Sequence, residues 1–445
     1  MLFSSLKLKT FQVILSILPI SLLLSFPLHA ETLAASGNEP VSVTHEGLSS
    51  KNDGAKSDGT KIDGAKSDGA KTDELPAYGF HYNNGLYATL VGYFGLKDIE
   101  LRNQQTLKLN VPSFRKKVLV KAIIQSEPAP LVVVLLGLDG KADGRLGKLW
   151  PSWFSEAGYH VLSFDSTFSP SFIDMSGHGV TGNLNAESER ISEIIGTFLD
   201  LDELKGKVSK IGIVGMSYGG LETLVLAEMA KDGKLKFKLD AAQAYSPPIA
   251  IEKTGMMIDR WHDEDRWHYT LADLSTRLSG HKPVSADEPV PFSDSLMRAA
   301  ISAVFRLGLA DVVVQNDKEF KLNALPSGDM DDEYVKRDYA ETWGYYRFMT
   351  EMCFPYWKKK LNLKNFQELF EPVALPALLQ KQPSYSETVI AADDPFDTPE
   401  DIAALKSGPG LTILVRGGHL GFVADPWTKA KLLTLFKSAP KQAAK

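Results

Sequence analysis

Hydrophobic residues recur along the chain in short runs that alternate with longer amphipathic stretches. Leu131–Leu136 is a continuous apolar run, as expected of a strand buried on both faces of a parallel sheet. The stretch 187–201 instead places Ile191, Ile194 and Phe198 on one helical face. The same patterns predict strands over residues 118–124, 159–164, 210–214 and 241–245, and helices over 150–157 and 221–230. Strand and helix alternating in this way indicate an α/β fold with a doubly wound, mostly parallel sheet.

The alternation stops between residues 248 and 382. Helical patterns dominate there, and four of the seven tryptophans fall in this stretch: Trp261, Trp267, Trp343 and Trp357. Strand patterns return at residues 388–392 and 411–415. We therefore expect a helical insertion, about 248–382, that interrupts the sheet domain and covers it.

The first 30 residues have the layout of a secretory signal. Lys7 and Lys9 precede the apolar run Phe11–Phe26, and Ala30 is the expected last residue before cleavage. The alternative is an uncleaved anchor, but this run is shorter than the about 20 apolar residues of a spanning helix. We predict a cleaved signal peptide over residues 1–30 and an exported protein, either periplasmic or secreted.

Residues 51–75 form a pentapeptide repeat that begins Lys51-Asn52-Asp53-Gly54-Ala55. Its charges alternate and it has almost no apolar residue, so it cannot build a core. Its Asp-Gly pairs do not have the spacing of a calcium-binding loop. We interpret residues 31–75 as a disordered linker and residues 76–440 as the α/β domain.

Composition and charge narrow the choice of function. The chain is 44% hydrophobic, as in ordinary globular proteins, and its net charge of -6 gives no reason to expect a nucleic acid partner. Cys353 is the only cysteine, so no intrachain disulfide can form. It has no neighbouring catalytic motif, and we expect a buried structural thiol.

The candidate nucleophile is Ser217, in Gly215-Met216-Ser217-Tyr218-Gly219. Gly-x-Ser-x-Gly alone is a weak signal, but this serine directly follows a predicted strand and directly precedes a predicted helix. That is the strand-to-helix turn on which such a nucleophile is presented. The glycines allow the crowded turn, and the helix N-terminus points free N–H groups at a developing oxyanion.

A serine hydroxyl needs a base, and the chain order expected on this fold is Ser, then Asp or Glu, then His. His419, in Gly417-Gly418-His419-Leu420-Gly421-Phe422, is the histidine that follows the last predicted strand. Three histidines in the insertion are expected to be surface or core residues, namely His262, His268 and His281. His178 precedes the serine in a glycine-rich loop, where it could line the pocket.

The acid that orients His419 is expected just after the strand 388–392. Asp393 and Asp394 both lie there, followed by Pro395. Neighbouring side chains diverge, so only one carboxylate can reach the imidazole. We assign this role to Asp394 and expect Asp393 to cap or orient the loop, with the reverse assignment left open.

An oxyanion hole requires two backbone N–H donors. The residue after the nucleophile, Tyr218, supplies one of them. The loop after the strand 131–136 supplies the other, and Leu138 is the candidate.

At these residues the sequence resembles the α/β-hydrolase superfamily. The similarity is greatest to its esterase- and lipase-like abhydrolase-domain branch, which has Asp-Asp-Pro and Gly-Gly-His-x-Gly-Phe motifs, here Asp393-Asp394-Pro395 and 417–422. It covers roughly residues 110–435 in motif order. Two features depart from the family pattern: Leu136-Gly137 stands where many relatives have His-Gly, and the insertion is long.

The resemblance implies a serine hydrolase that cleaves carboxylic esters through an acyl-enzyme, with a triad of Ser217, Asp394 and His419. It implies no cofactor and no metal, and a small-molecule or lipid-like ester as substrate. A thioesterase, amidase or phospholipase on the same fold remains an alternative, as does a non-catalytic binding protein. Acyl-chain preference, membrane contact and oligomeric state stay open.

Overall fold

The computed structural model describes residues 75–437, except 81, 97, 271–272, 274–276, 278–287, 327–332 and 406–409. The predicted signal peptide and the linker up to residue 74 lie outside the described residues, so both stay predictions. Leu75–Lys445 forms one compact unit. Within its described part, no helix is long and apolar enough to cross a bilayer.

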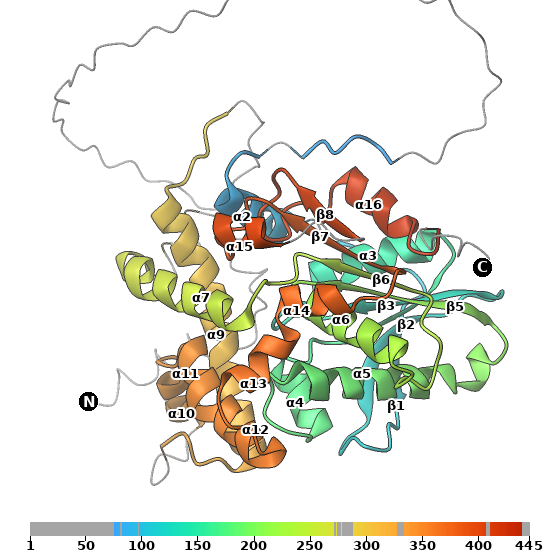
Figure 1. The fold of residues 1–445 in the computed structure, drawn as a ribbon, viewed down its shortest axis with the longest axis horizontal. Coiled ribbons are helices and arrows are strands. Elements are labelled where there is room, and N and C mark those ends of the chain that lie inside the picture. The colour runs from blue at the N-terminus through green and yellow to red at the C-terminus, as the bar shows by residue number, and fades with distance from the viewer. Residues whose placement is uncertain are drawn as a thin grey trace, which may run out of the picture. The chain divides into compact units, whose positions relative to one another are not determined.

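The centre of this unit is a mixed sheet (Figure 1). In the described residues its strands are β1 (Gln105–Leu109), β2 (Val118–Ile123), β3 (Ala129–Leu135), β4 (His160–Ser163), β5 (Val208–Met216), β6 (Ala241–Tyr245), β7 (Ser386–Ala391) and β8 (Leu411–Leu414). Their spatial order is β1-β2-β4-β3-β5-β6-β7-β8. Only the pairs β1–β2 and β2–β4 are antiparallel. The predicted α/β class and the α/β-hydrolase fold are confirmed.

Helices cover both faces of the sheet (Figure 1). Successive residues of a strand point to opposite faces. Val132 of β3 therefore packs in the same cluster as Trp150, whereas its neighbour Leu131 packs with Ile191. The helices are α3 (Arg145–Glu156) and α16 (Pro426–Leu433) on one face, and α5 (Leu184–Leu199) and α6 (Tyr218–Lys231) on the other.

Between β6 and β7 the described residues are helical or irregular and contain no strand. The helices of this cap are α7 (Ile251–Asp265), α9 (Asp294–Phe320), α10 (Glu333–Ala340), α11 (Tyr345–Arg347), a π-helix (Phe348–Cys353), α12 (Phe354–Leu361), α13 (Gln367–Phe370) and α14 (Leu375–Lys381). The cap shares a core with the sheet domain, in which Trp261 stacks on Phe396 and Phe348 packs edge-on against Phe168. The cap is thus held by buried aromatic contacts.

The remaining elements are short. The helices are α2 (Gly85–Phe94), α4 (Pro170–Ser176) and α15 (Pro399–Ala404), and the 3₁₀ turns are Asp202–Leu204, Arg266–His268 and Glu371–Val373. Neither α2 nor β1 was expected from the sequence pattern. β1 is mostly exposed and pairs only with β2, so its sequence lacks the apolar run of a central strand.

Helix α3 begins at Arg145, five residues before the expected start at Trp150. A proline favours the first turn of a helix, yet Pro151 lies inside α3. Leu149, Trp150 and Phe154 are buried against the sheet. Burial of these side chains offsets the backbone hydrogen bond that the proline cannot make.

Candidate active site

Ser217 lies between β5 and α6, at the predicted turn. Its backbone has φ 53° and ψ -122°, a conformation that side-chain-bearing residues rarely adopt. A Cβ at Gly215 would lie 2.0 Å from the carbonyl oxygen of Gly219, and one at Gly219 would lie 2.6 Å from that of Leu136. Only glycine therefore fits on either side, and the turn holds the Ser217 hydroxyl at the end of the strand.

The structure brings His419 and Asp394 to this serine. His419 Nε2 lies 2.9 Å from Ser217 Oγ, and its Nδ1 lies 2.8 Å from Asp394 Oδ2. All three side chains are buried. With Nδ1–H donating to the carboxylate, Nε2 is free to accept the serine proton. This arrangement can turn the hydroxyl into a nucleophile.

The two adjacent carboxylates point to different partners. Asp394 also accepts a hydrogen bond from the N–H of Phe396 through Oδ1, at 3.0 Å. Asp393 Oδ1 accepts from the N–H of Gly418 at 2.8 Å, directly before the histidine. Burial raises the pKa of Asp393. One carboxylate thus contacts the imidazole, and the other bonds to the backbone of the loop that carries it.

Helix α2 also supports the histidine loop. Thr89 Oγ1 accepts a hydrogen bond from the His419 N–H at 2.9 Å and donates to the Gly85 carbonyl at 2.7 Å. Sequence reasoning missed this helix, because it carries no catalytic motif. Two glycines in this mostly apolar helix, Gly85 and Gly92, were the available signal, since a glycine in a helical pattern often has a packing reason.

Two backbone N–H groups near Ser217 are free to bind an oxyanion. Tyr218 is the first residue of α6, where the N–H has no intrahelical acceptor. The N–H of Leu138, in the loop after β3, has no hydrogen-bond partner among the described residues. This loop is close to the serine, because a Cβ at Gly137 would lie 3.0 Å from that of Ser217. Leu138, Ser217 and Tyr218 line the same cavity.

A buried pair of glutamates lies behind the nucleophile and was not predicted. Tyr218 Oη donates to Glu187 Oε2 at 2.5 Å, and Glu187 Oε1 accepts from the N–H of Gly182 at 2.8 Å. Glu222, on α6, accepts from the hydroxyl of Thr167. Burial raises the pKa of both carboxyls, and the charge of Glu187 raises that of Glu222 further. These contacts link α5, α6 and the cavity wall.

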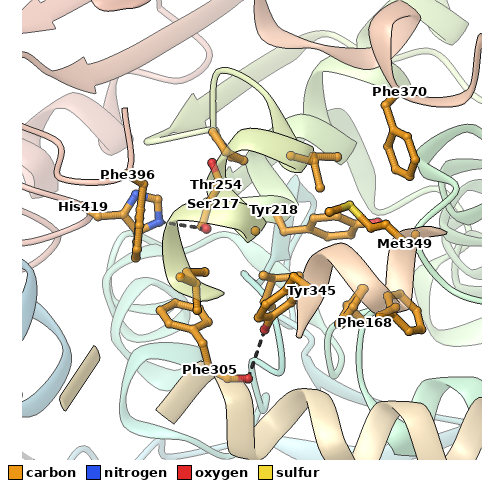
Figure 2. Close-up of a pocket in the computed structure, with 17 residues that line it drawn as sticks. Phe168, Ser217, Tyr218, Thr254, Phe305, Tyr345, Met349, Phe370, Phe396 and His419 are labelled. Atoms are coloured by element: carbon orange, nitrogen blue, oxygen red, sulfur yellow. Dashed lines mark hydrogen bonds between the residues drawn. The ribbon is translucent and has the colours of Figure 1, made fainter. Parts of the chain in front are cut away.

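The cavity above Ser217 is lined mainly by apolar side chains from the sheet domain and the cap (Figure 2). Thr254 Oγ1 is buried in this wall with no hydrogen-bond partner among the described residues. In Figure 2 His419 lies at one end of the cavity, and Met349 and Phe370 lie at the other. The site is thus suited to an apolar ligand.

Among the described residues, His178, His262 and Cys353 take no part in this arrangement. His178 does not line the cavity as the sequence suggested, because its Nε2 bonds to the Ser113 carbonyl at 2.6 Å. His262, half-buried on α7, lies 3.5 Å from Asp263, and His281 is outside the described residues. Cys353 is buried, and burial raises its thiol pKa well above the usual range. Across the described ranges, no group of three or more His, Cys, Asp and Glu could hold a metal ion.

Comparison with known proteins gives similarity of fold only. No family model matches the chain, and no curated protein matches it. An esterase of Pyrococcus furiosus is 12% identical, with a TM-score of 0.42 over 83% of this chain and 99% of that one. A carboxylesterase of Bacillus subtilis is 11% identical, with a TM-score of 0.39 over 79% and 95%. A bacterial membrane phospholipase A is 14% identical, with a TM-score of 0.39 over 75% and 86%.

Proposed function

We propose that this chain is a serine hydrolase that cleaves carboxylic esters through an acyl-enzyme intermediate. The observation that carries the proposal is the buried hydrogen-bonded series Asp394–His419–Ser217 at an apolar cavity. A nucleophile, a base and an orienting acid in hydrogen-bond contact are the parts that acyl transfer requires.

In this mechanism Ser217 Oγ attacks the ester carbonyl carbon while His419 Nε2 takes its proton. Asp394 stabilises the resulting imidazolium, and the N–H groups of Tyr218 and Leu138 donate to the oxyanion. His419 then gives the proton to the leaving alkoxide, which departs as an alcohol. A water molecule, deprotonated by His419, then attacks the acyl carbonyl carbon. The bond to Ser217 Oγ breaks, His419 returns the proton to Oγ, and the carboxylic acid is released.

The test is replacement of Ser217 by Ala, with Ser192→Ala on α5 as the matched control. We expect S217A to lose fluorophosphonate labelling and about 10³-fold or more of kcat/KM on short p-nitrophenyl esters, because no other group supplies the nucleophile. S192A should keep both. Labelling of S217A at the wild-type rate would contradict the assignment.

Two kinds of alternative exist: an enzyme that cleaves another acyl bond, such as a thioester or an amide, and a binding protein that does not catalyse a reaction. Thioesters and amides suit the same three side chains, so a matched panel of ester, thioester and amide substrates ranks them. A binding protein without catalysis has no need of the three hydrogen-bonded groups. Wild-type protein that neither labels nor hydrolyses any of the panel would favour that alternative.

A further inference from the structure

The cavity above Ser217 is too closed to hold a substrate in the conformation described. Its free volume is only about 30 Å³, room for about two waters. Ligand pockets typically provide about 300–1,000 Å³. A part of the wall must therefore move when a substrate binds, and a side chain with open space behind it can move at the least cost.

Open space of this kind lies next to the cavity, in a groove on the cap. The free volume of this groove is about 510 Å³. Four elements line both spaces, namely α7, α11, the π-helix and α13. In α7, for example, Ile251 lines the cavity and its neighbour Glu252 lines the groove. Among the described residues, Phe370 alone lines both.

Phe370 therefore separates the two spaces. It ends α13, a helix of four residues, and is buried at 2% exposure. The ring centroids of Phe370 and Phe366 are 4.6 Å apart, and those of Phe366 and Phe354 are 5.7 Å apart. Aromatic rings therefore continue from Phe370 along the groove. A displacement of the Phe370 side chain out of this shared wall would join the cavity to the groove.

We propose that Phe370 determines acyl-chain length, and that the acyl chain of a long-chain ester runs from Ser217 past Phe370 into the groove. This inference rests on the proposed ester hydrolysis at Ser217. It assigns the groove as the distal part of the acyl site.

The direction of the chain follows from the positions of the two ends. His419 must lie next to the leaving oxygen in order to protonate it, so the alcohol part belongs on the His419 side. The acyl part, which becomes bonded to Ser217, then points the other way, toward Met349 and Phe370 (Figure 2).

The lining residues define the chain further. The cavity is lined mainly by apolar side chains, among them Phe348 and Met349, and favours a hydrocarbon chain. Glu252 and Glu371 line the groove, and Glu252 Oε2 is buried without a partner among the described residues. Carboxylates repel an anionic group, so the far end of the chain is expected to be neutral.

The test is the ratio of kcat/KM for p-nitrophenyl dodecanoate to that for the butanoate, measured on the full chain. We expect Phe370→Ala and Phe370→Leu to raise this ratio about tenfold or more, and Phe370→Trp to lower it. The matched control is Phe305→Ala, which enlarges the cavity but does not face the groove. It should change both rates and leave the ratio within about threefold.

Leucine keeps most of the packing, so F370L gives the result if F370A fails to fold. A ratio that is unchanged in F370L and F370W, or that rises as much in F305A, would overturn the role of Phe370 while leaving ester hydrolysis intact. A wild-type protein that neither hydrolyses esters nor labels with fluorophosphonate would remove both proposals together.

Discussion

At the scale of single residues, the candidate site depends on side chains whose roles differ although their sequence environments are alike. Asp393 and Asp394 are adjacent and chemically identical, yet one bonds to the backbone of Gly418 and the other to the imidazole of His419. Their different contacts predict different consequences of the same substitution.

Asp394→Asn is expected to lower kcat by about 10³–10⁴-fold, because an amide cannot stabilise the imidazolium and favours the wrong tautomer. Asp393→Asn is the matched control. It keeps an oxygen for the Gly418 N–H, so we expect a loss of about tenfold or less. Steady-state kinetics on a short ester measure both. Equal losses would show that the two carboxylates have no separate roles.

At the scale of elements, α2 is the support that the sequence pattern did not reveal. A Cβ at Gly85 would lie 1.9 Å from the carbonyl oxygen of Asp393, and one at Gly418 would lie 2.3 Å from the carbonyl oxygen of Gly85. Gly418 also has φ +55°, a left-handed conformation that favours glycine. The helix, the acid loop and the histidine loop thus meet backbone to backbone.

Gly85→Ala is expected to separate α2 from the acid loop and to lower the free energy of unfolding by about 2 kcal/mol, with a loss of activity. The control is Gly196→Ala in α5, where a Cβ meets nothing within 4 Å. That change should stabilise the protein by up to about 1 kcal/mol, because alanine favours a helix. Thermal unfolding and ester hydrolysis are the measurements. A G85A protein as stable and active as wild type would contradict the close packing.

At the scale of the whole molecule, several buried carboxyl groups have a higher pKa in the folded state than in the unfolded state. Burial raises the pKa of Glu187 and Glu222, and burial together with the charge of Asp394 raises the pKa of Asp397 to about 8. A carboxyl with a raised pKa stays protonated in the folded chain after it has ionised in the unfolded chain. Its stabilising contribution is present at low pH and is lost as pH rises through the folded-state pKa.

We therefore expect the free energy of unfolding to fall between pH 4 and pH 9, with the Asp397 part lost between its ordinary value of 3.8 and about 8. Compared with wild type, Asp397→Asn should raise the free energy of unfolding more at pH 9 than at pH 4, by on the order of 1–3 kcal/mol. Asp98→Asn is the control, since Asp98 is exposed. Denaturant unfolding at several pH values measures this. A D397N protein with the same pH dependence as wild type would contradict the assignment.

The sequence by itself determined the features that depend on local pattern. Continuous apolar runs predict the central strands, because a strand buried on both faces must be apolar throughout. The Gly215–Gly219 turn and the order of Ser217, Asp394 and His419 are likewise visible along the chain. The mostly parallel sheet and its helical interruption followed from the same patterns.

Only the tertiary structure decided what depends on contacts between segments far apart in sequence. Whether Asp393 or Asp394 reaches His419 is set by side-chain directions that adjacent identical residues do not encode. The approach of α2 to His419 joins residues 330 positions apart through Thr89. The position of Phe370 between cavity and groove exists only once the cap has packed. Such contacts depend on the packing of whole elements, and local sequence does not specify them.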